Sequence, residues 1–495
     1  MSKICLCLTG KTIARNLEIL EKYRSQVDIA ELRVDFLDAE ERLHIRRFPE
    51  LAGVPTILTV RRRIDGGRFT EGEGARIVLL ATGLAFADAD RRRNFAYVDL
   101  ESDLEVPSLE EAARTFGTRI IRSMHDFRGV PADLARQLRE LRRHGDEIAK
   151  YAVMPQGLAD TAEIFRAARE TEDVEKILLG MGPYGTSTRI LAERLGSLLS
   201  FTSPRDEAGV ECAGPGQFDP VELEKDYRFR SLRKDTVIYG IIGSPLAATS
   251  SPMIHNPAFD RAGLNAVYVP FRTDSLPAFF NLADELSVKG ISVTIPFKED
   301  VVFSLRETSA EVKSIGACNT AIRQAVGWSG YNTDAVGFSD SLLAFLGRKH
   351  LRGKHIAIIG AGGVARAVAS EVHRLGGRAC VLNRSVVRAK EVAERFGFAW
   401  GSLDDRGISL MDKFHDVIVQ TTSVGMEGDL DADPIGLYRF LGSERVIDLI
   451  YKPPKTRMLA RAEAAGCSIL NGRDMLERQA RLQFALFTGM EFPEK

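Results

Sequence analysis

Short apolar runs recur along the first 225 residues and alternate with stretches of helical periodicity, among them Leu109–Phe116, Ala132–Arg143 and Thr161–Glu170. Short buried strands that alternate with amphipathic helices are typical of parallel βα units, and eight such units predict a (β/α)8 barrel. A doubly wound sheet is the competing architecture for the same pattern. The eight expected strands are Ile4–Leu8, Val27–Val34, Pro55–Val60, Phe95–Leu100, Thr118–Met124, Ile148–Met154, Lys176–Met181 and Val210–Ala213.

A second α/β pattern follows a charged stretch, Phe218–Asp235, which no apolar core pattern crosses. We therefore expect a domain boundary near residues 225–235. The strands predicted beyond it are Thr236–Ile242, Ala266–Pro270, Gly290–Ile295, Ala317–Arg323, His355–Ile359 and Arg378–Leu382. The predicted helices are Met253–Ala262, Leu276–Leu286, Val364–Leu375 and Arg473–Phe487. The expected fold class is α/β throughout.

Composition narrows the function classes. A chain of 495 residues is too long for one core, so several domains are expected. The net charge of -1 argues against nucleic-acid binding, and the runs Arg61–Arg63 and Arg91–Arg93 are only local. No apolar run approaches the roughly 18 residues of a membrane span. The chain enters a strand by Ile4, which leaves no room for a targeting peptide.

The cysteines carry no recognisable metal or disulfide spacing. They are scattered and include no C-x-x-C pair, so we expect no metal site and interpret them as buried small residues in a reducing, cytoplasmic environment. The six positions are Cys5, Cys7, Cys212, Cys318, Cys380 and Cys467.

Ionisable residues occur in and after the expected barrel strands, where a charge is costly unless it lines a site. Glu31, Arg33 and Asp35 alternate along the second strand and so face one side. Structural ion pairs near a rim are the alternative explanation, which suits these three residues better than a lysine within a strand. Further ionisable residues are Arg61 after the third strand, His125 after the fifth and Lys150 within the sixth.

Lys150 precedes the apolar residues Ala152, Val153 and Met154, so the sequence predicts an apolar environment for its amine. Burial lowers the pKa of a lysine from about 10.4, and a neutral amine can attack a ketone to form an iminium. His125 is a candidate to move a proton near neutral pH. These residues suggest proton abstraction next to a carbonyl, and aldolase and dehydratase chemistry remain equally open.

Five segments of the first half together resemble type I 3-dehydroquinate dehydratases, in the order of that family. They are Glu31–Asp35, Ser123–Phe127, Lys150–Gln156, Met181–Arg189 and Gly214–Gln217. The resemblance implies that Lys150 forms a Schiff base with the C3 ketone of 3-dehydroquinate. It implies that His125 removes a C2 proton and returns it to the departing C1 hydroxyl. Substrate contacts are implied for Glu31, Arg33, Arg61, Arg189 and Gln217, with Arg189 on the carboxylate.

Two positions depart from that family. Asp65 stands where a glutamate is expected, and Ala213 stands where a serine is expected. Asp65 is one methylene shorter than glutamate, which puts its contact with His125 or the substrate in question. Neither change removes the nucleophile or the base.

The second half contains a glycine-rich turn, Gly360–Ala365, between an apolar strand and an Ala-rich helix. The pattern G-x-G-x-x-A in this context predicts a dinucleotide site, because glycines let the backbone approach a pyrophosphate at a helix N-terminus. Polar clusters at Gly243–Pro252, Val293–Lys298 and Asn332–Asp334 precede it. Capping of a helix by Ser251 is the alternative for the first cluster. Together the clusters suggest a polar substrate that faces a hydride donor.

These segments resemble shikimate dehydrogenases, and the match extends through Gln420–Met426, Asp448–Tyr451 and Gly472–Gln479. The resemblance implies a catalytic pair, Lys298 and Asp334, in which Lys298 donates the proton. Substrate contacts are implied for Thr249, Ser251, Thr294, Asn319, Asn332, Tyr451 and Gln479. Coenzyme contacts are expected for Gly360, Ala361, Gly362, Gly363, Val364, Ala365, Asn383, Arg384, Ser385, Arg388, Thr422, Ser423 and Gly472.

Arg384 follows the strand at which NAD-dependent enzymes carry an acidic residue for the ribose, and it suits a 2′-phosphate instead. A plain surface arginine is the alternative. The sequence thus favours NADP over NAD. Departures from the family occur at Ala248, Thr249 and Ser292, where His, Ser and Asn are expected.

Combining these expectations gives a bifunctional shikimate-pathway enzyme. A TIM barrel (residues 1–225) is followed by a substrate-binding domain (235–338), a Rossmann NADP domain (339–470) and a C-terminal helix that returns to the substrate domain (471–495). The expected partners are small-molecule substrates, not nucleic acid or membrane, and the sequence does not reveal an oligomeric state. Two alternatives stay open: oxidation of quinate by the second half, and a metabolite-sensing regulator derived from these enzymes.

Overall fold

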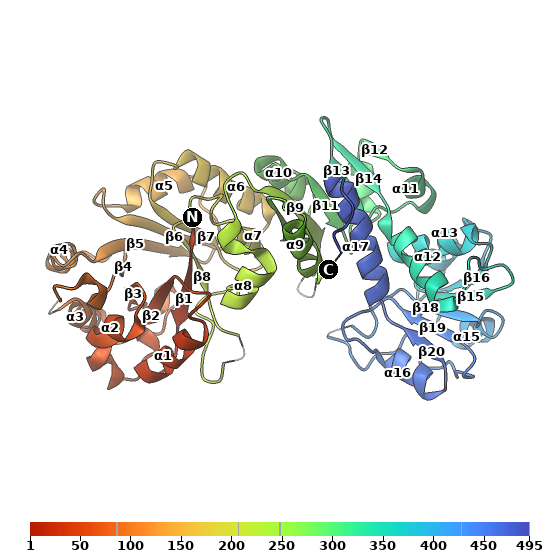
Figure 1. Ribbon diagram of the computed structural model, residues 1–495, viewed down its shortest axis with the longest axis horizontal. Helices are drawn as coiled ribbons and strands as arrows, with labels where there is room; N and C mark the ends of the chain where they lie inside the picture. The colour runs from red at the N-terminus through yellow and green to blue at the C-terminus, as the bar shows by residue number, and fades with distance from the viewer. Residues whose placement is uncertain (86–87, 206, 247–248, 427, 495) are drawn as a thin grey trace. The chain divides into compact units, whose positions relative to one another are not determined.

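The computed structural model describes residues 1–85, 88–205, 207–246, 249–426 and 428–494 (Figure 1). The chain divides into two compact units, which are described separately. The first joins Met1–Gly240 with Gly263–Val288, and the second joins Ile241–Ala262 with Lys289–Lys495. Strand β9 (Val237–Gly243) crosses this division. No helix among the described residues is long and apolar enough to cross a membrane.

Eight parallel strands form the barrel of the first unit, in the order β7-β6-β5-β4-β3-β2-β1-β8. Strands β1 to β7 lie side by side in chain order and β8 pairs with the other edge of β1. This order lacks the reversal of a doubly wound sheet and confirms the predicted barrel. An isolated bridge between Lys176 and Ser197 joins β7 to the segment before β8. The strands are β1 (Lys3–Leu8), β2 (Ile29–Arg33), β3 (Thr56–Thr59), β4 (Tyr97–Glu101), β5 (Arg119–Asp126), β6 (Ile148–Val153), β7 (Lys176–Gly180) and β8 (Leu199–Thr202).

Alternating residues of the barrel strands enter two different cores, as the period of two in a strand requires. Cys5 and Cys7 of β1 pack in the interior of the barrel, whereas Leu6 and Leu8 pack with the surrounding helices. The helices are α1 (Ile13–Lys22), α2 (Phe48–Ala52), α3 (Glu73–Leu84), α4 (Pro107–Thr115), α5 (Leu134–Leu141), α6 (Leu158–Glu170), α7 (Thr186–Ile190) and α8 (Pro220–Tyr227). Strand β10 (Ala266–Arg272) and helix α10 (Leu276–Leu286) complete this unit, with α10 packed against α6.

Two expectations about the end of the barrel were wrong. The eighth strand is Leu199–Thr202, and Val210–Ala213 lies in the loop that follows it. Leu199–Thr202, and not Val210–Ala213, pairs with the free edge of β1, and that pairing is a long-range feature. The charged stretch Phe218–Asp235 does carry a core pattern, because helix α8 buries Leu223 and Tyr227 and leaves its charged residues outside.

In the second unit, β11 pairs antiparallel with β13, β13 pairs antiparallel with β14, and β14 pairs parallel with β12. The N-terminus of α12 is capped by the Asn332 side chain, which accepts from the Ala335 N–H. The elements of this part are α9 (Ser251–Arg261), β11 (Gly290–Val293), β12 (Glu307–Thr308), α11 (Ala310–Ile315), β13 (Thr320–Arg323), β14 (Trp328–Tyr331) and α12 (Thr333–Leu346).

A parallel sheet of six strands, in the order β17-β16-β15-β18-β19-β20, forms the rest of the second unit. Ile356 and Ile358 of β15 face one core and Ala357 and Ile359 face another, so the sheet is covered on both sides. The strands are β15 (His355–Ile359), β16 (Arg378–Leu382), β17 (Ala399–Gly401), β18 (Val417–Gln420), β19 (Arg445–Asp448) and β20 (Ser468–Leu470). The helices are α13 (Gly363–Arg374), α14 (Val386–Glu394), α15 (Asp405–Met411), α16 (Arg457–Ala464) and α17 (Arg473–Thr488).

Helix α17 packs along α12 and also contacts α9 and β13 (Figure 1). The C-terminal segment therefore leaves the six-stranded parallel sheet after β20 and brings its side chains to the strands that precede that sheet. This placement determines one wall of the second candidate site.

Candidate active sites

The first candidate site is a cavity at the carboxyl ends of the barrel strands, where barrel enzymes place their chemistry. It encloses about 550 Å³ of empty space, part of it open to solvent. The structure brings together around it every substrate-binding or catalytic residue that the sequence suggested for the first half. The ionisable and polar lining consists of Glu31, Arg33, Arg61, Asp65, His125, Lys150, Arg189 and Gln217.

Lys150, on β6, is buried to 4% exposure, yet its surroundings are not apolar as the sequence had predicted. Its Nζ donates to Asp99 Oδ2 at 2.6 Å and lies 3.8 Å from Glu31 Oε1. The same ammonium lies 4.3 Å from the centre of the Phe201 ring. Carboxylates of β2 and β4 and an aromatic face therefore hold one buried amine at the cavity wall.

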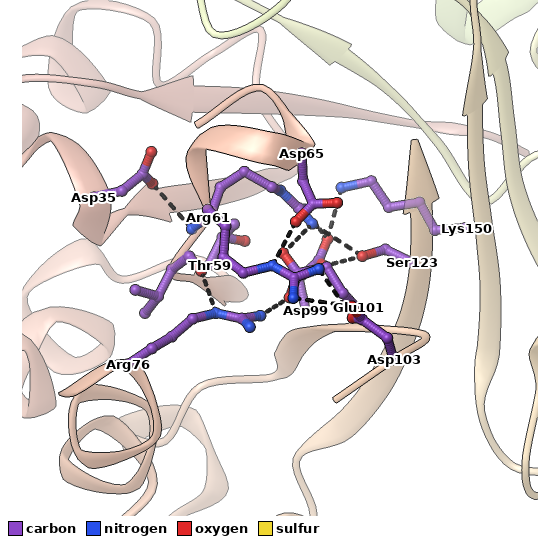
Figure 2. A network of polar contacts seen from close by, with 12 residues as sticks. Asp35, Thr59, Arg61, Asp65, Arg76, Asp99, Glu101, Asp103, Ser123 and Lys150 are labelled. Carbon is purple, nitrogen blue, oxygen red and sulfur yellow. Dashed lines mark hydrogen bonds and ion pairs between the residues drawn. The ribbon is translucent and has the colours of Figure 1, made fainter. Parts of the chain in front are cut away.

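Arg61 is the centre of the polar network that surrounds this lysine (Figure 2). Its guanidinium contacts Asp99 and Glu101 at 2.7 Å each, and it donates to Ser123 Oγ at 3.0 Å. Burial opposes ionisation of Asp99, but the positive charges of Arg61 and Lys150 outweigh this effect and hold the pKa of Asp99 well below its usual range. Asp99 is therefore a fixed negative charge beneath the amine.

His125, on β5, has a different electrostatic environment. Burial lowers the pKa of its imidazole well below the ordinary 6.5, and the positive charges of Arg61 and Lys150 lower it further. Its buried Nδ1 has no hydrogen-bond partner among the described residues. The imidazole is thus neutral at physiological pH and has the lone pair that a general base needs.

Arg189 is a buried cation whose side chain has unused hydrogen-bond donors, as an anion-binding group requires. It is 2% exposed and donates from one terminal nitrogen to the Pro215 carbonyl at 2.9 Å, but its Nε and other terminal nitrogen have no partner in the described chain. Burial lowers the pKa of this guanidinium to about 10, so it remains charged. A buried guanidinium that lines a cavity with unused donors fits a carboxylate.

The two departures in this half have different consequences. Asp65 accepts from Arg62 Nε at 2.6 Å, so this carboxylate, although it lines the cavity, is paired with a neighbour in its own turn. Ala213 contributes only its backbone carbonyl, which accepts from Arg33 at 3.4 Å. Arg33 in turn is held by Asp35 through two bonds of 2.9 and 2.8 Å.

The second candidate site lies in the second unit and is organised around Lys298 and Asp334. Lys298 Nζ donates to Asp334 Oδ2 at 2.6 Å, and both side chains are largely buried, at 12% and 8% exposure. Asp334 lies in the first turn of α12, just after the Asn332 cap. The pair can hold and exchange a proton at a shielded position.

An amide and hydroxyl network borders this pair. Asn319 Nδ2 donates to Thr333 Oγ1 at 2.9 Å and to Gln479 Oε1 at 3.4 Å, and Gln479 comes from α17. Ser292, where asparagine was expected, donates to Gln483 Oε1 at 2.8 Å and so is also tied to α17. The network links β11, β13, α12 and α17 in one buried cluster.

The other residues predicted to contact the substrate have interactions that give less support for that role. Asn332 donates to the Ala317 carbonyl at 2.8 Å while its oxygen caps α12, and Ser251 is buried in the first turn of α9. The Ser251 N–H donates to Thr249 Oγ1 at 3.3 Å. Thr294 is partly exposed after β11, and Tyr451 follows β19. Ala248 lies outside the described residues.

The turn between β15 and α13 fits a nucleotide phosphate. Gly360 has a φ of +116°, and a Cβ there would lie 2.3 Å from Thr421 Oγ1. Gly362 caps α13 without a side chain, and a Cβ there would meet nothing within 4 Å. Free N–H groups of a 12-residue helix thus face open space. A Cβ on Gly363 would lie 3.1 Å from the Lys298 Cβ, so this turn is adjacent to the Lys298–Asp334 pair.

Arg384 and Arg388 are exposed after β16 and form no ion pair among the described residues. They have the free guanidinium groups that a ribose 2′-phosphate would engage. Asn383 donates to the Ser385 carbonyl at 3.1 Å and shapes this turn. Gly472 is required by packing, because a Cβ there would lie 2.0 Å from the Leu449 carbonyl oxygen. Thr422 and Ser423 lie in the turn after β18.

The sequence interpretation missed several residues of these sites. Asp99 and Glu101 alternate along the buried strand β4, which is the same signal that singled out Glu31 and Arg33. Thr333 lies within the predicted polar cluster Asn332–Asp334 but was given no contact of its own. Gln483 carried no signal, because an isolated polar residue on a helix is usually solvated. The cysteines were placed correctly except Cys212, which is exposed, and all six are free thiols. No cluster suited to a metal ion occurs in the described part of the chain.

The fold and the sites define a chain with two enzymatic parts: a barrel with a buried lysine in a polar cavity, and a nucleotide-dependent oxidoreductase. Comparison with known proteins agrees with this division. Residues 4–234 match the family model for type I 3-dehydroquinase. Residues 241–321 match the shikimate dehydrogenase substrate binding domain, and residues 343–425 match shikimate / quinate 5-dehydrogenase.

A chloroplastic bifunctional 3-dehydroquinate dehydratase/shikimate dehydrogenase of Arabidopsis thaliana is 30% identical over 517 residues, which cover 100% of this chain and 83% of that protein. An NADP(+) shikimate dehydrogenase of Pyrococcus abyssi is 37% identical over 51% of this chain and 92% of its own length. A Thermus thermophilus shikimate 5-dehydrogenase structure, solved with NADP(H) and shikimate, is 32% identical, with a TM-score of 0.46 and coverage of 52% of this chain and 95% of that chain. The chain belongs to the family of bifunctional 3-dehydroquinate dehydratases/shikimate dehydrogenases.

Proposed function

We propose that the barrel dehydrates 3-dehydroquinate to 3-dehydroshikimate and that the second half reduces this product to shikimate with NADPH. The observation that carries the first step is the cavity in which the buried Lys150 amine, the neutral His125 imidazole and the unpartnered Arg189 donors meet. The observation that carries the second is the Lys298–Asp334 pair beside the Gly360–Ala365 turn.

In the first reaction, Arg189 holds the substrate carboxylate and orients the C3 ketone toward Lys150. The amine must lose a proton before it attacks the ketone carbon, and the carbinolamine that results loses the former ketone oxygen as water to form the imine. His125 then takes a proton from C2 and returns a proton to the C1 hydroxyl, which leaves as water. Water hydrolyses the imine, so the net change is the loss of one water from the substrate.

In the second reaction, the carbonyl oxygen of 3-dehydroshikimate accepts a proton from Lys298. Asp334 keeps the Lys298 side chain oriented for this transfer. NADPH, when bound at the Gly360–Ala365 turn, supplies the hydride to the carbonyl carbon. Arg384 and Arg388 would hold its 2′-phosphate, and Asn319, Thr333 and Gln479 would offer donors and acceptors to the substrate hydroxyls.

Sodium borohydride tests the first reaction directly. Reduction in the presence of 3-dehydroquinate should attach the substrate covalently to Lys150, which peptide mass spectrometry would locate, because borohydride reduces an imine to a stable amine. The Lys150→Ala variant should remain unlabelled. Labelling of another lysine, or no labelling of active protein, would contradict the proposed nucleophile.

A coupled assay tests the whole sequence. Incubation with 3-dehydroquinate and NADPH should form shikimate and consume NADPH without any added enzyme. The same assay in reverse, with quinate offered in place of shikimate, decides whether the second half also oxidises quinate. We also propose a cytoplasmic location and the domain limits 1–225, 235–338, 339–470 and 471–495. The bifunctional relative in Arabidopsis thaliana is described as chloroplastic.

A further inference from the structure

A second cavity lies at the end of the barrel opposite the dehydratase site, where β7 begins. It is lined by Ala168, Glu172, Lys176, Arg194, Leu195, Gly196 and Lys234, and it encloses about 230 Å³, part of it open to solvent. Lys176 is the first residue of β7, and the isolated bridge to Ser197 holds its backbone in place. The lining contains three cations and one carboxylate.

The carboxylate does not compensate the buried cations. Lys176 is 1% exposed, and its Nζ donates to the Thr171 carbonyl at 2.6 Å, with no carboxylate within ion-pair distance in the described chain. Arg194 donates to the backbone carbonyls of Lys234 and Leu286 rather than to an acid. Glu172 pairs with Lys234 at 3.3 Å, and both of these side chains are more than half exposed.

Elsewhere in the barrel, buried cations follow a consistent rule. Seven lysines and arginines are buried among the described residues, and five of them pair with a carboxylate. The two exceptions are Arg189, which faces the candidate substrate cavity, and Lys176. A buried charge without a counter-ion is costly, so an exception that lines a cavity points to a ligand of opposite charge.

We propose that the Lys176 cavity binds a small oxyanion of the phosphate or sulfate type. The Lys176 ammonium and the Arg194 guanidinium supply donors from the buried side, and Lys234 closes the exposed side. Because these residues come from β7, from the segment before β8 and from the segment before β9, the anion ties the base of the barrel to the chain that leads out of it.

The electrostatics of Lys176 agree with this placement. Burial, together with the positive charge of Lys234, lowers its pKa to about 8. The other charged groups that act on it are Glu172, Asp173 and Arg139, and Arg194 lines the same cavity. An oxyanion beside the amine would oppose this loss of charge.

Equilibrium dialysis of labelled inorganic phosphate against the full chain at pH 7 tests the proposal. Wild type should bind one more phosphate per chain than Lys176→Gln or Arg194→Gln. Lys225→Gln is the matched control, because Lys225 is an exposed lysine of helix α8 with no carboxylate partner among the described residues. Shikimate and NADP+ in the dialysis buffer occupy the proposed dehydrogenase site, and any phosphate bound in the dehydratase cavity is common to all four proteins. Equal phosphate binding by all four proteins would overturn the proposal.

A second measurement needs no variant. Phosphate binding to wild type should weaken by at least fivefold between pH 7 and pH 9.5, because Lys176 loses its proton while the arginines and carboxylates around it keep their charge. Phosphate itself becomes more negative as the pH rises, so its own titration would strengthen binding at pH 9.5. Binding that is unchanged or stronger at pH 9.5 would overturn the assignment of this cavity, whatever the state of the Lys176→Gln protein.

Discussion

The two halves of the chain each hold a buried lysine 2.6 Å from an aspartate, yet the two contacts differ in everything around them. Lys150 lies within a strand and is surrounded by Asp99, Glu31 and the Arg61 network from other strands of the barrel. Lys298 follows a strand and lies beside Asp334 at the start of a helix, bordered by neutral amides and hydroxyls.

This difference fits two kinds of chemistry. A nucleophilic amine must be held rigidly at one atom of the substrate, and the barrel provides this with fixed charges from several strands. A proton donor has only to exchange a proton near the developing alkoxide, and one carboxylate with a neutral surround is sufficient. An identical contact distance therefore does not identify a role.

Removal of the nucleophile should give the largest effect. Lys150→Ala is expected to lower dehydratase kcat by about 10³-fold or more, since no other group can form the imine. NADPH-dependent reduction of 3-dehydroshikimate by the same protein should stay at the wild-type rate. Comparable losses in both activities would show a folding defect instead of a chemical one.

Removal of the proton donor should give a smaller loss. Lys298→Ala is expected to lower dehydrogenase kcat by about 10²- to 10⁴-fold with little change in KM for shikimate, which is the usual range for a general acid. Dehydratase activity serves as the internal control. A wild-type kcat would contradict the assignment of Lys298.

Arg189 tests the anion-binding side of the barrel cavity. Arg189→Gln is expected to lower kcat/KM for 3-dehydroquinate about 10- to 100-fold, mainly through KM, because a charged hydrogen bond contributes about 1.5–3 kcal/mol. Steady-state kinetics on this variant and on Arg205→Gln, an exposed arginine of the same half, give the comparison. A loss confined to kcat would contradict a role of Arg189 in substrate binding and indicate a role in the chemical step.

Arg384 tests coenzyme choice in the other half. Arg384→Gln is expected to reduce the preference for NADPH over NADH about tenfold, which corresponds to the loss of one charge-assisted contact of about 1.4 kcal/mol. Arg348→Gln, another exposed arginine of the second unit, is the control. An unchanged preference for NADPH over NADH would contradict the assignment of Arg384 to the 2′-phosphate.

The smallest effect concerns pH. Because the pKa of His125 is lowered, its neutral, basic form persists below pH 6.5, and dehydratase kcat/KM should remain on its plateau at pH 6. A histidine of ordinary pKa near 6.5 would instead leave about a quarter of the activity at pH 6. A pH–rate profile between 5.5 and 8 distinguishes the two, and a bend near 6.5 would contradict the buried environment of His125.

Much of this architecture was predictable because its signals are local. The order of apolar runs and helical stretches predicted the barrel and the parallel sheet, and the glycines of Gly360–Ala365 predicted the turn that follows β15. The last barrel strand was missed because its identity depends on closure. Leu199–Thr202 is a strand by virtue of pairing with β1, almost 200 residues earlier.

The amino-acid sequence by itself determined which chemical groups are present and on which kind of element each lies: a lysine within a strand, a histidine at the end of the neighbouring one, a lysine after a third. Only the tertiary structure decided what each group contacts. Lys150 meets Asp99 across 51 residues, and Asn319 meets Gln479 across 160. Periodicity records the face on which a side chain lies, whereas the partner of a buried charge is set by which strands and helices become neighbours.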